Sequence, residues 1–532
     1  MPSRIAILAF SAVALLSLAC ATNPVTGKKE LVLIPEAEEI HIGQENYGPT
    51  RQMQGGDYTV DPELTSYVSE VGQRLAAVSD RPHLPYELKV LNSSVPNAWA
   101  LPGGKIAINR GLLVELGNEA ELAAVLGHEI VHAAARHGAK QVERGLLLQG
   151  AVIAAQIALS DEDYGGLVVV GAALGAFLVN QKYSRDAESE ADLYGISYMH
   201  RAGYDPEAAA TLQETFVRLS EGRSPNWLEG LFASHPPSRE RVAANRAIAA
   251  TLVAEEAARG ELYANRYQER LAKLNRQKDS YDAYDRGRAA LTEGRSDEAL
   301  ALARQALGAE PREPRFHTLR GDVRLQQQRY RDAVTDYERA IDLDGTYFLP
   351  YLRRGQARKA LGDVSSARAD LEHSLELLPT AEAHLELGVL AEERGDIDEA
   401  LALYRAVGAS DTEAGRAAGS AIARLDLPNH PGAYLELRPL LGHDGIVTIE
   451  VENRAPIAVR DVEIVIQRVN QKGRWKHHAQ RVLRGEIPAE SRGTWRTDIG
   501  PFETSADLES LRLRVVAAQP AIERSARIDG GP

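Results

Sequence analysis

Small residues recur at a nearly constant spacing between residues 283 and 407. The recurring glycines are Gly287, Gly321, Gly355 and Gly388, and alanine follows each of them twelve residues later, at Ala299, Ala333, Ala367 and Ala400. Self-similarity at a period of about 20–50 residues is typical of a solenoid, in which each repeat packs against its neighbours. This segment therefore predicts pairs of helices that stack closely at the small residues.

Other positions keep the same register. They are Ala306 and Ala340, Pro311 and Pro379, and Gly294, Gly362 and Gly395. The pattern resembles the tetratricopeptide repeat, a helix pair whose small residues let the two helices pack closely. The resemblance implies an α-solenoid over residues 281–412 with a concave surface that binds peptides or partner proteins. The alternative is a series of helical hairpins without a fixed register.

The chain changes character at "LPNHPG", residues 427–432. Six segments with alternating apolar and polar residues follow, at 433–439, 445–453, 459–469, 475–485, 491–500 and 508–516. Successive side chains of a strand point to opposite faces, so this alternation predicts a small β-sandwich over residues 430–532. His477 and His478 are adjacent and would point to opposite faces, which makes them poor joint metal ligands.

The N-terminal residues predict secretion. A short basic start is followed by an apolar run over residues 5–18, which is too short to span a membrane comfortably. Cys20, the only cysteine, stands where a bacterial lipoprotein signal would be cut and acylated, and Ala21 is not the Asp that retains many lipoproteins at the inner membrane. We expect a signal peptide over residues 1–19 and a periplasmic protein that is lipid-anchored to the outer membrane. The alternative is an ordinary signal peptide that holds a cysteine by chance.

The net charge disfavours a nucleic-acid-binding protein, and the length of the apolar runs disfavours membrane-spanning helices. A formal net charge of −14 argues against nucleic-acid binding, because phosphate binding needs a basic face. The apolar stretches 145–159 and 166–179 are shorter than the roughly twenty residues that a membrane-spanning helix needs. They predict a pair of buried helices or, alternatively, a hairpin that contacts lipid or an unfolded apolar client.

The sequence "GHEIVHAAARHG", residues 127–138, carries an HExxH motif. The stretch before it is rich in Ala, Leu and Glu, which favour helix. In a helix, His128 and His132 share a face and direct their imidazoles at one point, while Glu129 lies on the flank, an arrangement that suits zinc. His137 would point roughly 140° away from His132 by the helical period, so we expect it to be structural or solvated.

A hydrolytic zinc usually has three protein ligands and leaves the fourth place to water. The third ligand is expected from residues 183–192, where Glu188 and Asp192 also share one helical face. We assign Glu188 to the metal and Asp192 to a place beside it, where a carboxylate accepts the other ring N–H of a ligating histidine. Glu190 lies off that face and is expected to be structural. The alternative is that both motifs belong to a solvated charged surface.

Together, "GHEIVHAAARHG" and "SRDAESEAD" resemble the zinc metallopeptidase family that includes the CAAX prenyl endopeptidase, HtpX and the periplasmic BepA-like proteases. The resemblance covers roughly residues 22–260 and extends to "NAWALPGGKIAINRGLL" and "SHPPSRER". It implies a mainly α zincin-like domain with a small β-sheet over residues 20–270. A catalytic domain followed by repeats is similar to BepA-like proteins, which couple proteolysis to quality control of outer-membrane proteins. The added β-domain departs from that pattern.

The resemblance also implies roles for single residues. His128, His132 and Glu188 would bind zinc, and Glu129 would act as general base and acid. His235 would either occupy the open metal position at rest or stabilise the oxyanion. Its alternative role is to start a helix beside two prolines.

The substrate cleft is expected near the strand-like residues 86–92 and 104–109. By resemblance, Asn97 and Ala98 would lie beside the cleft. The strand at Lys105 to Asn109 would hold the substrate as an added β-strand, an arrangement that favours extended or unfolded chains.

These expectations combine into a multidomain chain with a metallopeptidase domain, a solenoid and a β-sandwich. Its expected function is zinc-dependent hydrolysis of unfolded or misassembled envelope proteins, with the repeats binding clients or the outer-membrane assembly machinery. The alternative is a largely non-catalytic periplasmic chaperone or assembly scaffold whose zinc site is plugged. An intramembrane protease is disfavoured, because no apolar run after the signal peptide reaches spanning length.

Overall fold

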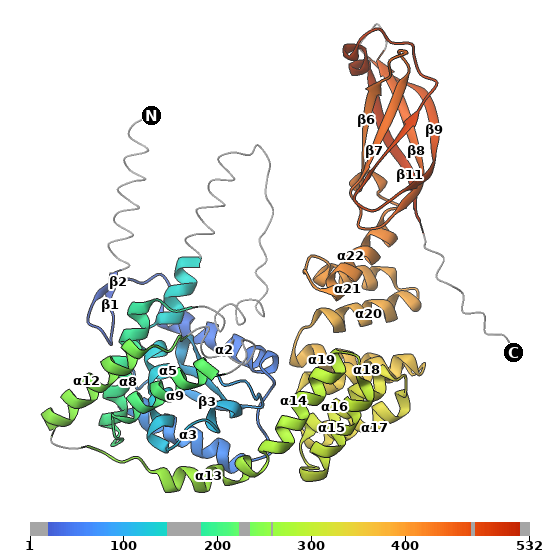
Figure 1. Cartoon of the computed structure of the whole chain (residues 1–532). Helices are drawn as coiled ribbons and strands as arrows, with labels where there is room; N and C mark the ends of the chain where they lie inside the picture. The colour runs from blue at the N-terminus through green and yellow to red at the C-terminus, as the bar shows by residue number, and fades with distance from the viewer. Residues whose placement is uncertain (1–19, 146–181, 223–234, 257–258, 470–473, 522–532) are drawn as a thin grey trace, which may run out of the picture. The chain divides into compact units, whose positions relative to one another are not determined.

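The computed structural model describes residues 20–145, 182–222, 235–256, 259–469 and 474–521 (Figure 1). The predicted signal peptide and, apart from Gly145, the two apolar stretches 145–159 and 166–179 lie outside the described residues. The chain divides into two compact units, Met1–Gly362 and Asp363–Pro532. Within the described ranges, no helix is both long enough and apolar enough to cross a membrane.

The first unit begins with a mainly helical domain around a small sheet. Its strands are β1 (Cys20–Thr22), β2 (Lys29–Leu31), β3 (Glu87–Leu91), β4 (Ala98–Leu101) and β5 (Lys105–Asn109). Its helices are α2 (Glu36–Met53), α3 (Pro62–Ala77), α4 (Arg110–Leu113), α5 (Glu119–Ala134), α8 (Arg185–Arg201), α9 (Ala208–Gly222), α12 (Arg239–Glu256) and α13 (Ala264–Arg276). The predicted mainly α domain with a small β-sheet is confirmed.

The sheet has the order β3-β5-β4, with β3 parallel and β4 antiparallel to β5. Strands β3 and β5 coincide with the predicted strand-like segments, whereas β4 was missed. All four residues of β4 are buried, so the sequence shows no alternation between polar and apolar residues there. Because both edges of β5 are already paired, the prediction that this strand takes up the substrate as a neighbouring strand is wrong.

Helix α5 lies among the other helices of this domain (Figure 1). Asn118 caps its N-terminus by accepting a hydrogen bond from the backbone of Glu121, and every residue of the helix except His128 is buried. Helix α8 approaches α5 closely at two glycines, since a Cβ on Gly195 would lie 2.9 Å from the backbone nitrogen of His128. This close approach brings the acidic face of α8 beside the histidines of α5.

The repeats form as predicted. In the first unit they comprise α14 (Lys278–Thr292), α15 (Ser296–Ala309), α16 (Pro314–Gln326), α17 (Tyr330–Leu343) and α18 (Phe348–Ala360). In the second unit they comprise α19 (Val364–Leu377), α20 (Ala381–Glu393), α21 (Ile397–Val407) and α22 (Glu413–Asp426). A Cβ on Gly321 would lie 2.6 Å from the ring of Tyr337, so glycine is what permits the contact between α16 and α17. The predicted α-solenoid is thus confirmed, while the four predicted domain ranges stay predictions.

A buried polar network joins the first repeats to the sheet. Glu313, which is fully buried, accepts hydrogen bonds from the Tyr281 hydroxyl at 2.5 Å, the Asn92 amide at 3.1 Å and the Arg315 backbone at 2.9 Å. Asn92 follows β3 directly and also accepts a hydrogen bond from Arg110 at 2.8 Å. The junction is therefore held by directional bonds from three segments of the chain.

Glu313→Ala is expected to lower the free energy of unfolding of the first unit by about 2–3 kcal/mol, because three buried donors lose their acceptor. Denaturant or thermal unfolding measures the change. Glu298→Ala removes a half-exposed carboxylate on α15, in the same unit, and should change stability by about 0.5 kcal/mol or less. Equal effects of the two substitutions would contradict the inference.

The second unit ends in two stacked three-stranded sheets (Figure 1). The strands are β6 (Leu435–Leu441), β7 (Val447–Asn453), β8 (Val459–Val469), β9 (Trp475–Ile487), β10 (Arg492–Arg496) and β11 (Leu511–Pro520). The sheets have the orders β10-β7-β6 and β11-β8-β9, and their inward residues form a separate apolar core. Each of the six predicted segments overlaps one of these strands, and the predicted β-sandwich is confirmed.

Candidate metal centre

The HExxH residues lie on the last two turns of α5. His128 and His132 face the same point, and their Nε2 atoms are 3.1 Å apart. Glu188 on α8 reaches this point from the side, with its two carboxylate oxygens each 3.5 Å from one of the Nε2 atoms. The structure thus brings together the three residues that the sequence motifs assigned to a metal.

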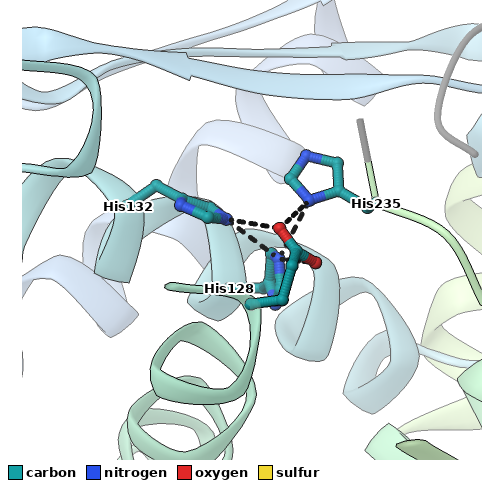
Figure 2. A group of neighbouring side chains, drawn as sticks. His128, His132 and His235 are labelled. Carbon is teal, nitrogen blue, oxygen red and sulfur yellow. Dashed lines mark hydrogen bonds and ion pairs between the residues drawn. The ribbon is translucent and has the colours of Figure 1, made fainter. Parts of the chain in front are cut away.

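His235 supplies a fourth donor. Its Nδ1 lies 3.2 Å from Nε2 of His128 and 2.8 Å from Oε1 of Glu188. The imidazoles of His128, His132 and His235 converge in Figure 2, and one donor atom from each of these residues and Glu188 lies within 4.8 Å of the others. His235 thus adds a fourth possible donor to a centre where a catalytic zinc would need only three protein ligands.

The donor atoms have the spacing that zinc requires. Zinc binds nitrogen at about 2.0–2.1 Å, so two nitrogens of a tetrahedral site lie about 3.3 Å apart. The separations of 3.1 and 3.2 Å between imidazole nitrogens match this value. Three imidazoles and a carboxylate are also donors that suit zinc better than calcium or magnesium, which take oxygen ligands.

Glu129 lies beside the four donors without joining them. Its Oε1 is 3.7 Å from Nε2 of His235, while its buried Oε2 has no hydrogen-bond partner among the described residues. A cavity of about 40 Å³ lies next to Glu129 and His128 and has Leu212 and Phe216 in its wall. That volume is large enough for a water molecule beside Glu129.

Comparisons with known proteins agree with this geometry. The sequence profile of peptidase family M48 matches residues 62–249, and a tetratricopeptide-repeat profile matches residues 284–347 and 352–435. Metalloprotease YcaL of Escherichia coli (strain K12) is 32% identical over 187 residues, which are 34% of this chain and 70% of that protein. The chain belongs to peptidase family M48.

Two other M48-like relatives cover different lengths of the chain. The beta-barrel assembly-enhancing protease of Escherichia coli (strain K12) is 28% identical over 416 residues, 68% of this chain and 83% of that protein. Mitochondrial metalloendopeptidase OMA1 of Schizosaccharomyces pombe is 39% identical over 183 residues, 34% of this chain and 51% of that protein. The family resemblance predicted from the motifs is therefore confirmed, and the first of these relatives matches over more than the peptidase domain.

Asp192 lies beside the candidate metal ligands, where the sequence predicts it. Its Oδ1 is 3.0 Å from Nδ1 of His128, so the carboxylate can accept the proton of the ring nitrogen that faces away from the metal. Arg241 on α12 donates two hydrogen bonds to Asp192, at 2.7 and 2.8 Å, and its Nη1 lies 3.1 Å from Glu188. The sequence motifs did not predict a role for Arg241, although Arg241 is the last residue of the segment "SHPPSRER".

His137 does not point away from His132, so that expectation is wrong. Helix α5 ends at Ala134, and the helical period therefore does not apply to residue 137. Its Nδ1 lies 2.8 Å from Nδ1 of His132, and its Nε2 lies 3.3 Å from Glu190. Tyr183, also missed, stacks on the His132 ring with centroids 3.9 Å apart.

Burial and neighbouring charges shift the pKa values of the residues at this candidate metal centre. Burial lowers the pKa of His132 well below its ordinary value. Burial opposes ionisation of Glu188, but His235 and His128 outweigh it and hold the Glu188 pKa far below its usual range. Burial likewise opposes protonation of His128, yet Glu188 and Asp192 raise its pKa to about 10. The centre thus favours a positive charge at its middle, and metal binding would release the proton that His128 holds.

The expected cleft residues lie at the start of β4. Ala98 is fully buried and pairs with Ile108 of β5, and the backbone carbonyl of Asn97 accepts a hydrogen bond from Asn109 at 2.8 Å. The side-chain oxygen of Asn97 is buried and has no hydrogen-bond partner among the described residues. Among the described strands, β4 pairs with β5 on one side only, so it and not β5 is the edge strand next to these residues.

Proposed function

We propose that the chain is a zinc-dependent endopeptidase of the bacterial cell envelope that hydrolyses peptide bonds in unfolded or misassembled envelope proteins. The observation that carries the proposal is the convergence of His128, His132 and Glu188 beside a carboxylate, Glu129, that has one buried oxygen free. A hydrolytic zinc site needs this combination of ligands and a general base.

The proposed chemistry assigns each residue one task. Zinc, when bound, lowers the pKa of a bound water and polarises the scissile carbonyl. Glu129 accepts a proton from the attacking water through Oε2 and later delivers it to the leaving amine. Burial raises the pKa of Glu129, which makes its carboxylate a better proton acceptor than an exposed one.

His235 has two proposed states. At rest its Nδ1 lies among the metal donors, so it excludes water from the fourth position. When it leaves that position, its imidazole can donate a hydrogen bond to the developing oxyanion. Substrate would bind in extended form along the edge of β4 that has no partner strand among the described residues, beside Asn97 and Ala98, because an edge strand offers unpaired backbone groups.

Location and partners follow from the relatives and from the sequence. The Escherichia coli relative that matches 68% of this chain is named for beta-barrel assembly, and tetratricopeptide solenoids bind proteins. We therefore assign the chain to the periplasm, with its repeats binding clients or the outer-membrane assembly machinery. Acylation of Cys20 would anchor it to the membrane.

Metal removal tests the proposal. Cleavage of a denatured outer-membrane β-barrel protein is expected to fall to background in the presence of a chelator and to return when one equivalent of zinc is added. Peptide release by mass spectrometry and metal content of the purified protein measure the two properties. Cleavage that persists in the chelator would refute a zinc mechanism.

The position of His235 also favours a second candidate function, in which the plugged centre is silent and the repeats act as a chaperone or scaffold. The Glu129→Gln variant distinguishes the two functions. A chaperone or scaffold should still suppress client aggregation when the general base is removed, whereas a function that depends on proteolysis should be lost. Full rescue of envelope defects by this variant would make proteolysis secondary, whereas loss of rescue would exclude the scaffold as the main function.

A further inference from the structure

Helix α5 is interrupted by a turn at residues 135–136, and further helical residues follow from His137. Arg136 has φ of 62°, a conformation that glycine usually supplies at the end of a helix. Buried partners hold Arg136 there: its Nε donates to Glu39 at 3.0 Å, and its Nη2 donates to the carbonyl of Ile34. The left-handed region is unfavourable for a residue with a Cβ, so these contacts maintain a turn that α5 alone would not form. The turn places His137 against His132.

A continuous series of polar contacts then runs outward from His132. Nδ1 of His132 lies 2.8 Å from Nδ1 of His137, whose Nε2 lies 3.3 Å from Oε2 of Glu190. The other oxygen of Glu190 accepts a hydrogen bond from Lys28 at 2.7 Å. His137 is buried and Lys28 is exposed, so the series leads from the metal centre to the surface.

The protons in this series can be assigned from geometry. Nε2 of His132 faces the other metal donors and must be bare to bind a metal, so the proton of that neutral ring is on Nδ1. Two nitrogens 2.8 Å apart then require that Nδ1 of His137 accept this proton. A neutral His137 carries its own proton on Nε2, which is the atom that faces the Glu190 carboxylate.

We propose that His137 is a positioning residue for the M48 metal ligand His132. Its Nδ1 accepts the His132 proton, and Glu190, neutralised by Lys28, fixes the His137 tautomer that makes this possible. The proposal rests on the zinc function proposed above. It differs from the arrangement at His128, where a carboxylate, Asp192, contacts the outer ring nitrogen.

The consequence is a ring that is fixed in two directions. His137 holds one edge of the His132 imidazole, and Tyr183 covers its face. Outer partners of this kind orient the ligand and raise its basicity, and losing one typically costs about 10–100-fold in metal affinity or activity. His137 should therefore affect zinc binding without touching zinc.

Two amide substitutions separate the two hydrogen bonds. The oxygen of asparagine lies as many bonds from Cα as Nδ1 of histidine, whereas the amide of glutamine reaches the position of Nε2. His137→Asn is expected to keep the acceptor for His132 and to hold the zinc Kd within about threefold, while His137→Gln keeps only the contact with Glu190 and should raise the Kd by about 10–100-fold. The Kd is measured by chelator competition on the full chain.

The absorption spectrum of the cobalt(II)-substituted protein gives a second readout. The His137→Asn spectrum should match that of the unsubstituted protein, and the His137→Gln spectrum should shift, because the His132 ring is no longer held. His83→Gln, at an exposed histidine, is the matched control and should change neither property.

The outcomes distinguish this inference from the proposed function. If the unsubstituted protein binds no zinc, both fail. If it binds zinc tightly and His137→Asn and His137→Gln behave alike, only the role of His137 fails. Should position 137 tolerate no change in folding, Glu190→Ala removes the outer acceptor at a partly exposed site and should raise the zinc Kd at least about threefold. An unchanged Kd in that variant overturns the inference.

Discussion

Replacing Glu129 by glutamine is expected to abolish peptide-bond cleavage while leaving zinc bound. Glu129 lines the cavity at the metal centre and has a buried carboxylate oxygen without a hydrogen-bond partner among the described residues, and an amide in its place cannot accept a proton from water. Loss of a general acid and base typically costs about 10²–10⁴-fold in rate. We therefore expect kcat to fall by about that factor, with zinc content unchanged by metal analysis.

Glu214→Gln is the matched control for this prediction. Glu214 is a half-exposed carboxylate on α9, in the same domain, and is paired with Arg246 at 2.7 Å. Its replacement should leave cleavage and zinc content unchanged. Cleavage by Glu129→Gln at the rate of this control would remove Glu129 from its assigned role.

Replacing Glu188 by glutamine is expected to remove zinc itself. Glu188 is the acidic member of the donor cluster, and the charge of its carboxylate offsets that of the cation. Since losing an outer partner alone costs about 10–100-fold, loss of this direct ligand should raise the zinc Kd by more than about 100-fold and stop cleavage. The same chelator competition measures the change.

The two substitutions therefore have opposite signatures. Glu129→Gln should bind zinc without cleaving. Glu188→Gln should lose both zinc and cleavage unless zinc is added in excess. A Glu188→Gln protein that keeps full zinc affinity would show that the carboxylate is not a ligand. The three imidazoles of His128, His132 and His235 would then have to hold the metal by themselves.

Much of the architecture could be predicted because it depends on local periods. The repeat of small residues predicts paired helices, and the structure shows why: a Cβ at Gly388 would lie 2.4 Å from the ring of Tyr404 in the partner helix. Alternation beyond residue 427 predicts strands because inward positions such as Ile464 and Ile466 must be apolar to fill the core. Strand β4 could not be predicted in this way, since all four of its residues are apolar and buried, which removes the alternation.

The residues of the candidate site also fall into those that a local period predicts and those that depend on tertiary packing. His128, His132, Glu188 and Asp192 could be selected from spacing alone, because residues four apart share a helix face. Arg241 could not, because its contact with Asp192 depends on how α12 packs against α8. The direction of His137 could not be predicted for a related reason: the period of α5 ends at Ala134, and Arg136 in the left-handed conformation interrupts the helix before residue 137.

What the sequence by itself determined is therefore the set of local surfaces: two ligand faces on two helices, a solenoid of small-residue contacts and a β-sandwich. Only the tertiary structure decided that His235 would lie beside His128 and Glu188, that β4 would be an edge strand and that His137 would contact His132. The physical reason is the separation along the sequence of the residues that determine each feature. Helix and strand periods are set by neighbouring residues, whereas these contacts join segments that are brought together only when α5, α8 and α12 pack around a common core.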